Sequence, residues 1–217
     1  MRSAAGKKIT VLLVDDHAVV REGYRRLLER DDSLVVVGEA AAAAEAIRRD
    51  GELKPDVIVL DIALPGISGI EVLRRIIARR PEARVLMFSM YQDGVYASRA
   101  INAGARGYLS KASAPDLLVE AVRSVAEGRR YVSPDVEHAI TLQSSAASQL
   151  AGALSTRELE VLRMLTQGYG VEQIAERLGL SPKTAANHQS SIKQKLGAES
   201  ALQLILIAQQ LGLNADT

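Results

Sequence analysis

Five polar side chains in the first 111 residues of the chain come directly after short apolar runs, and their types suit phosphate and metal chemistry. They are Asp15, Asp16, Asp61, Ser89 and Lys111. Three carboxylates that converge repel one another unless a cation lies among them, and Mg²⁺ prefers oxygen ligands of this kind. A lysine and a hydroxyl nearby would bind the oxygens of a phosphoryl group. These residue types therefore indicate phosphoryl chemistry, provided that the fold brings them together.

The elements that would position these residues are short strands that alternate with amphipathic helices. The strand-like runs are rich in Val, Ile and Leu, which is typical of a parallel sheet buried on both faces. Between them apolar residues recur at helical spacing, as in Ile70, Leu73 and Ile77. Five strand-then-helix units predict a doubly wound α/β domain with a five-stranded parallel sheet, of the flavodoxin-like kind. The five runs are residues 9–14, 34–39, 57–61, 84–89 and 106–110.

In an open parallel sheet, the loops at the carboxyl ends of the strands form the ligand-binding crevice. The acidic pair ends the first run, Asp61 the third and Ser89 the fourth, and Lys111 follows the fifth. Taken alone, the acidic pair would more often be interpreted as the start of the helix near His17, and we interpret His17 itself in that way. Five polar residues at four strand ends are hard to explain so simply. We therefore predict one functional site at this edge of the sheet.

Composition narrows the class of protein. The 217 residues include six Tyr, one Phe, no Trp and no Cys, and the formal net charge is +1. Few aromatic residues argue against binding of single strands by base stacking, and the lack of Cys excludes disulfide scaffolds and zinc fingers. The apolar run of residues 9–14 is too short for a signal sequence or a membrane span. We expect a soluble, cytoplasmic protein of two small domains without a membrane partner.

The second half of the chain is predicted to be helical. Residues 133–142 predict a short helix, and the small and polar residues 144–153 predict a flexible linker. Helical patterns then return, and Ser155 and Glu158 form a capping box. The predicted boundaries are 8–127 for the first domain, 128–153 for the short helix and linker, and 154–217 for the helical domain.

Four motifs in the first domain resemble the receiver domain of two-component response regulators. They are DDH at 15–17, VLDIALPGISGIEVL at 59–73, LMFSMYQD at 86–93 and GYLSKASAPDLL at 107–118. They occur in the order and spacing of that family, over about residues 8–127. The resemblance implies that Asp61 is the phosphoacceptor and attacks the phosphohistidine of a sensor histidine kinase.

The same resemblance implies a Mg²⁺ site. Asp16 would bind the ion directly and Asp15 mainly through water, while Asp61 and the backbone carbonyl of Ala63 would be further ligands. A metal ion and one lysine would supply the positioning and charge neutralisation that phosphoryl transfer needs.

The resemblance also implies phosphoryl-binding and switch residues. Ser89 and Lys111 would bind phosphoryl oxygens, and Tyr108 would be the aromatic switch that turns inward when Ser89 moves. Two positions depart from the family pattern, because Leu64 stands where many receivers have Met and Met90 where many have Ala or Gly. Met90 could narrow access to the phosphoryl group.

Residues 153–198 resemble the four-helix LuxR-type helix-turn-helix domain of the NarL/FixJ response regulators. Most of the shared positions specify packing and capping. The resemblance implies a scaffold helix over residues 171–178 and a recognition helix over residues 182–195 that enters the major groove of DNA. The candidate DNA contacts are Lys183, Thr184, Asn187, His188, Ser190, Lys193 and Lys195.

The recognition helix departs from the family at its reading face. Family members usually have Val-Lys where this chain has Ala185 and Ala186, so a lysine that commonly faces DNA is missing. Asn187 can still bind an adenine edge, and Ser190 can bind a base or a phosphate. We therefore expect modest DNA affinity that depends on dimer formation.

The final helical segment, ALQLILIAQQLGL, is apolar on more than the one stripe that packing on a small bundle requires. In the resembling family this helix forms the interface of the DNA-bound dimer, which implies that Leu202, Ile205 and Leu206 lie in a dimer interface. A two-fold symmetric dimer would read two half-sites.

These features favour a transcription factor, not an enzyme, that phosphorylation activates by freeing the helical domain across the linker. The expected partners are a sensor histidine kinase, double-stranded DNA and a second copy of the phosphorylated chain, with RNA polymerase as a further candidate. Two alternatives stay open. The helical domain could bind a protein instead of DNA, which the missing lysine and the neutral charge of that domain favour. An enzyme with Asp61 as covalent nucleophile ranks last, because the sequence indicates no catalytic acid or substrate pocket.

Overall fold

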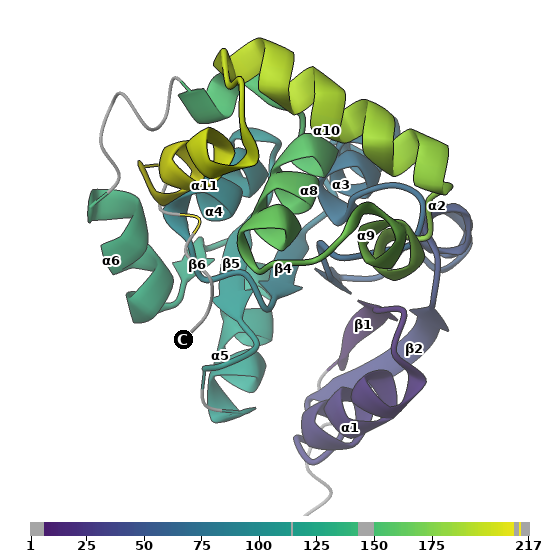
Figure 1. Cartoon of the computed structure of the whole chain (residues 1–217). Coiled ribbons are helices and arrows are strands. Elements are labelled where there is room, and N and C mark those ends of the chain that lie inside the picture. The colour runs from purple at the N-terminus through teal and green to yellow at the C-terminus, as the bar shows by residue number, and fades with distance from the viewer. Residues whose placement is uncertain (1–6, 114, 143–149, 211–212, 214–217) are drawn as a thin grey trace, which may run out of the picture.

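The chain forms an α/β domain followed by a helical domain (Figure 1). The computed structural model describes residues 7–113, 115–142, 150–210 and 213. Six parallel strands form one sheet in the order β2-β1-β3-β4-β5-β6. The strands are β1 (Ile9–Val14), β2 (Leu34–Ala40), β3 (Val57–Leu60), β4 (Val85–Ser89), β5 (Gly107–Ser110) and β6 (Tyr131–Val132).

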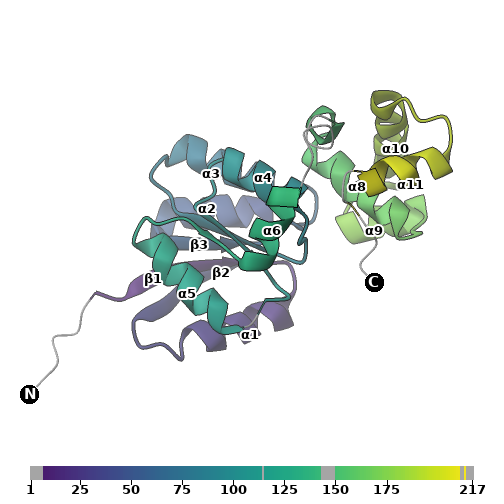
Figure 2. The ribbon, with the colours of Figure 1, turned by 90° about the vertical axis from the view of Figure 1, so that its left-hand side faces the viewer.

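Helices cover both faces of this sheet, as predicted (Figure 2). Helices α1 (Ala18–Leu28) and α5 (Pro115–Ala126) lie on one face, and α2 (Ala43–Leu53), α3 (Gly69–Arg79) and α4 (Gly94–Asn102) lie on the other. β1 and β3 are buried almost throughout, because apolar side chains pack on both of their faces.

The sheet differs from the prediction at its edge, where β6 pairs in parallel with β5. The sequence analysis predicted five strands, and a strand of two residues is too short to produce a recognisable pattern. The short helix predicted after it is confirmed as α6 (Pro134–Leu142), which packs beside α4. Ser133 precedes that helix, but its hydroxyl makes no hydrogen bond within the described residues.

The helical domain consists of α8 (Thr156–Thr166), α9 (Val171–Leu178), α10 (Pro182–Leu196) and α11 (Ala201–Gln210). The predicted capping box is confirmed, because Ser155 Oγ accepts from the Glu158 amide and the Glu158 carboxylate accepts from the Ser155 amide. Residues 143–149, which include most of the predicted linker, lie outside the described residues. The remaining linker residues, 150–153, are helical, and Ala151 among them is buried, so the prediction of a flexible linker is wrong for this part. No helix in the described part of the chain is long and apolar enough to cross a membrane.

Candidate functional site

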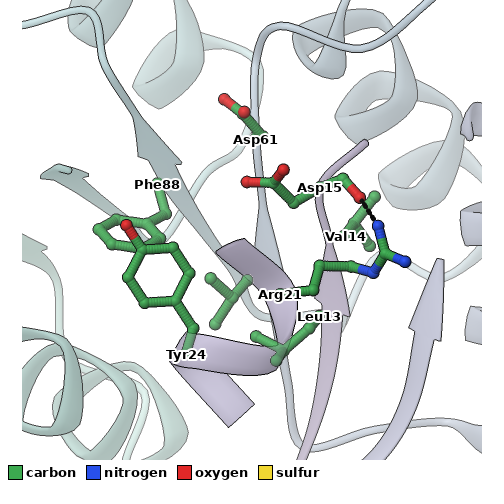
Figure 3. A pocket seen from close by; sticks show the side chains of 8 residues that line it. Leu13, Val14, Asp15, Arg21, Tyr24, Asp61 and Phe88 are labelled. Atoms are coloured by element: carbon green, nitrogen blue, oxygen red, sulfur yellow. Dashed lines mark hydrogen bonds between the residues drawn. The ribbon is translucent and has the colours of Figure 1, made fainter. Parts of the chain in front are cut away.

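The carboxyl ends of β1, β3 and β5 bring Asp15, Asp61 and Lys111 together. The Lys111 ammonium lies 2.6 Å from Asp15 Oδ2 and 2.5 Å from Asp61 Oδ2. Figure 3 shows the two carboxylates near each other at the strand ends. All three side chains are nearly buried, so water screens their charges only weakly.

Burial and neighbouring charges shift the pKa values of Asp61 and Lys111 in opposite directions. Burial raises the pKa of Asp61 above its usual range, although the Lys111 charge and hydrogen bond oppose that effect. Burial would lower the pKa of Lys111, but Asp61 and Asp15 outweigh it and raise that pKa. A divalent cation beside Asp61 would add to the stabilisation of its carboxylate, which is the form that can act as a nucleophile.

The acidic pair supplies oxygen atoms that suit such a cation. Candidate ligand atoms of Asp15, Asp16 and His17 all lie within 4.8 Å of one another. The Asp16 side chain is about three-quarters buried, and its Oδ1 lies 2.7 Å from Nδ1 of His17. His17 is the residue just before α1, as the sequence analysis interpreted it. The carboxylate oxygens fit the preference of Mg²⁺ for hard ligands.

Close packing of the loop after Asp61 requires a glycine. A Cβ atom at Gly69 would lie 1.9 Å from the Asp61 carbonyl oxygen, so no larger residue fits there without displacing the backbone. The Gly69 amide donates to the Ile62 carbonyl at 2.7 Å. The start of α3 is therefore held against the end of β3, and the Ala63 amide donates to Asp61 Oδ1 at 3.3 Å.

The predicted switch residues, Ser89 and Tyr108, both form hydrogen bonds with the backbone of Tyr91. The Tyr91 amide donates to Ser89 Oγ at 3.3 Å, and the Tyr108 hydroxyl donates to the Tyr91 carbonyl at 2.6 Å. Ser89 and Tyr108 are fully buried, so the Tyr108 ring already lies inside the domain. Met90 lies between Ser89 and Tyr91 in the chain, and its side chain is 62% exposed.

Helix α10 presents the predicted DNA contacts in two different environments. Lys183, Asn187 and Ser190 are exposed, and Thr184, His188 and Lys193 are half-buried. Lys195 donates to Glu158 Oε2 at 2.7 Å, so its charge already has a partner inside the domain. Hydrogen bonds from Lys195, Ser191 and Ser155 outweigh the effect of burial and lower the pKa of Glu158 to about 2.

The predicted dimer surface on α11 is accessible in part. Leu202 and Leu206 are 66% and 51% exposed, whereas Ile205 is half-buried. Two large apolar side chains one helical turn apart leave an apolar strip uncovered.

Comparison with known proteins identifies both domains. The family model of the response regulator receiver domain matches residues 11–123, and that of the bacterial regulatory proteins of the luxR family matches residues 152–214. The response regulator UvrY of Escherichia coli (strain K12) is 37% identical over 213 residues, which cover 96% of this chain and 98% of UvrY. The chain belongs to the NarL/FixJ family of response regulators. It is a two-component response regulator that regulates transcription through a LuxR-type DNA-binding domain.

Solved structures of related response regulators include DNA complexes. RcsB from Salmonella enterica serovar Typhimurium, bound to the promoter rprA in the presence of the phosphomimetic BeF3⁻, is 26% identical with a TM-score of 0.65, and the match covers 94% of this chain and 99% of RcsB. A structure of two RcsB dimers bound to two parallel DNAs is also 26% identical, with a TM-score of 0.61, and covers 94% of this chain and all of that one.

In this response regulator the first helix of the DNA-binding domain packs against the receiver. Helix α8 carries Arg157, whose guanidinium donates to the Leu64 carbonyl at 3.1 Å, and Arg163, which binds Asp93 at 2.5 Å. The Gly66 amide donates to the Leu178 carbonyl at 3.1 Å. Leu64 and Gly66 belong to the loop after Asp61, and Asp93 follows Ser89 closely. The DNA-binding domain therefore touches both loops that border the candidate phosphorylation site.

Buried charges line this contact, a role that was not predicted from the sequence. Glu160 is fully buried and pairs with Arg157 at 2.5 Å, while Arg163 and Asp93 are nearly buried. Arg163 also lies over the Tyr91 ring, 4.9 Å from its centre. On the receiver side Arg99 donates to the carbonyls of Ala151 and Leu154. The bond of Arg157 to the Leu64 carbonyl and the Arg163–Asp93 pair join the two domains, and Glu160 pairs with Arg157 from within α8. We call these contacts the interdomain latch.

A cleft beside this contact reaches the recognition helix. His188 lines a cleft of about 290 Å³ together with receiver residues from Gly66 to Arg74 and with Arg157 of α8. Burial there lowers the pKa of His188. One predicted DNA contact thus faces the receiver, while Asn187 and Lys183 face solvent.

Proposed function

We propose that this response regulator is phosphorylated on Asp61 by a sensor histidine kinase, and that phosphorylation releases its DNA-binding domain to dimerise and bind DNA. The observation that carries the proposal is the convergence of Asp61, Asp15 and Lys111 at one edge of a parallel sheet. An isolated buried carboxylate would be unfavourable, so a carboxylate held next to a lysine and a second acid indicates a site built for chemistry.

In the proposed reaction a carboxylate oxygen of Asp61 forms the new P–O bond as the P–N bond of the phosphohistidine breaks, and the histidine nitrogen recovers a proton. Lys111 is within reach of the incoming oxygens, because its ammonium already contacts Asp61. Ser89 would bind another phosphoryl oxygen after leaving its contact with Tyr91.

Asp15, Asp16, Asp61 and the Ala63 carbonyl are the proposed ligands of Mg²⁺. When bound, the ion neutralises charge on the transferred group. Lys111 holds both Asp15 and Asp61 in the structure, so it keeps the two mutually repelling carboxylates close together.

Two short routes connect this site to the latch. The loop after Asp61 carries Leu64, whose carbonyl binds Arg157. The loop after Ser89 carries Tyr91 and Asp93, which contact Arg163. A shift of either loop when a phosphoryl group binds would separate partners in the latch. Because these contacts hold α8 on the receiver, their loss would favour its release.

Release would expose His188 and leave the α11 strip formed by Leu202 and Leu206 free to pair with a second copy. RcsB offers support, since its structures contain DNA together with a phosphomimetic and dimers on DNA. A contact with RNA polymerase stays a prediction. The match to the luxR family favours DNA over a protein as the partner of the helical domain.

The DNA contacts are tested by fluorescence anisotropy over a salt series, with a duplex selected from genomic fragments and a scrambled duplex. Phosphorylation with acetyl phosphate is expected to raise affinity for the selected duplex. Lys193→Ala should weaken both duplexes alike and reduce the salt slope by about one per subunit, because one phosphate contact contributes about 0.9. Asn187→Ala should instead reduce discrimination by about 1 to 3 kcal/mol with little change in slope.

The two variants control for each other, because they lie on the same helix and differ only in the expected kind of contact. Unchanged binding in both would show that α10 does not face DNA.

We also expect the latch to respond to pH through Glu160. In the closed arrangement burial, opposed by Arg157, raises the pKa of Glu160 to about 7 from an ordinary value of 4.5. The closed form therefore binds this proton more tightly than the released form. Raising the pH from 4.5 to 7 should favour release, by at most about tenfold per pH unit for one proton, and the effect should level off above pH 7.

The measurement is energy transfer between dyes on single cysteines placed at Asp32 and Gln194, which the absence of native Cys makes simple. Burial also raises the pKa of Asp93, so Glu160→Gln should flatten most but not all of the pH dependence. An unchanged profile in Glu160→Gln would rule out Glu160 as the titrating group.

A further inference from the structure

Arg21 on α1 makes an unusual contact with the backbone of the acidic pair. Its Nη1 donates to the Asp15 carbonyl oxygen at 2.6 Å, and its side chain is only 14% exposed (Figure 3). Arginines on a helix surface usually extend into water, whereas this one is turned inward toward the site. A charge-assisted hydrogen bond to a main-chain carbonyl fixes that peptide group more firmly than a neutral one would.

The contact controls the geometry of Asp16. The Asp15 carbonyl belongs to the peptide that joins Asp15 to Asp16, and because the peptide is planar, holding its oxygen also orients the Cα of Asp16. The other side of Asp15 is held as well, since its amide donates to the Ala40 carbonyl at 3.1 Å. The Asp15 carboxylate is held by Lys111 and by the His17 amide. Arg21 is therefore the side chain that fixes the direction in which Asp16 leaves β1.

A neighbouring acid keeps the charge of Arg21 from opposing a cation at this site. Glu39 at the end of β2 accepts from Arg21 Nε at 3.2 Å and from Arg25 Nη1 at 2.9 Å. Arg25 thus shares the carboxylate of Glu39, and its side chain is 41% exposed. Arg25 also pairs with Glu29, whose Oε1 lies 3.5 Å from Arg25 Nε, so two carboxylates balance the two arginines and the group has little net charge.

We propose that Arg21, oriented by Glu39, is a positioning residue that holds the Asp15–Asp16 peptide so that the Asp16 carboxylate is placed to bind the divalent cation. This inference rests on the proposed Mg²⁺ site. Residues that orient metal ligands from outside commonly change metal affinity by 10- to 100-fold when they are removed.

The test is calorimetric titration of the full-length chain with Mg²⁺ alone. Arg21→Gln is expected to weaken Mg²⁺ binding by about tenfold or more. The matched control is Arg25→Gln, which removes an equal charge and another partner of Glu39, and it should stay within about twofold of wild type. Arg21→Lys should restore part of the affinity, since an ammonium can still donate to the carbonyl.

A second readout separates positioning from a merely structural role. With acetyl phosphate as donor, Arg21→Gln should need more Mg²⁺ for half-maximal phosphorylation and yet approach the wild-type rate at saturating Mg²⁺. Should that variant fold poorly in a thermal unfolding scan, Glu39→Gln takes its place, with a smaller loss of affinity in the same direction.

Two outcomes are distinguishable. If wild type binds Mg²⁺ and Arg21→Gln (or Glu39→Gln in its place) binds it equally well, the positioning role is wrong while the proposed site stands. If wild type itself binds no Mg²⁺, the proposed metal site fails.

Discussion

Replacing Asp61 by Asn is expected to abolish phosphorylation of the protein. The variant keeps the size of the side chain and its contact with the Ala63 amide, but the amide that replaces the carboxylate is not a nucleophile. Intact-mass measurement after incubation with acetyl phosphate and Mg²⁺ should show the added phosphoryl mass on wild type and none on the variant. DNA binding by the variant should then be indifferent to the phosphodonor.

The matched control is Asp32→Asn, which changes an exposed aspartate outside the site by the same substitution. It should be phosphorylated as wild type is. Retention of the phosphoryl mass by Asp61→Asn at the wild-type level would exclude Asp61 as the acceptor. Asp15 and Asp16 would then be the next candidate acceptors.

The largest effect on DNA binding is expected from Asp93→Asn, which should let the unphosphorylated protein bind DNA. Asn still caps α4 by accepting from the Tyr96 amide, as Asp93 does, but it removes the Arg163–Asp93 ion pair between the two domains. Losing a charge-assisted hydrogen bond across this contact destabilises the closed arrangement by about 1.5 to 3 kcal/mol. The opening equilibrium should therefore rise by about 10- to 100-fold.

Anisotropy with the selected duplex, without a phosphodonor, measures this effect. The isolated fragment 150–217 gives the level expected for a fully released domain. If Asp93→Asn binds no better than unphosphorylated wild type, the latch does not restrain the DNA-binding domain.

The receiver site could be predicted from the sequence because the carboxyl ends of parallel strands lie at the same edge of the sheet. A polar residue that follows a buried run has a known location in such a fold, so the order of the strands along the chain is enough to group Asp15, Asp61 and Lys111. Their direct contacts in the structure agree with that grouping. The capping box at Ser155 was equally accessible, because its two residues lie only three positions apart.

The contact between the domains had no comparable signal. Arg157, Glu160 and Arg163 look like a solvated helix face, which is what charges at this spacing usually form. They are buried because the receiver covers them, and Arg157 and Arg163 bind Leu64 and Asp93 there. These partners lie 93 and 70 positions earlier in the chain, too far away for a local sequence pattern to indicate the contact. For the same reason the pairing of Lys195 with Glu158, 37 positions apart, did not follow from counting the basic residues on α10.

Helix α8 holds two sets of contacts on different sides, and this division has an evolutionary consequence. Arg157, Glu160 and Arg163 face the receiver, whereas Glu158 binds Ser191 and Lys195 of the recognition helix. The DNA-binding unit is thus assembled before any signal arrives. Mutations at exposed positions of α10 can change which genes are regulated without altering sensitivity to the kinase. Mutations in the latch can change that sensitivity without altering the genes, so selection can adjust the two properties separately.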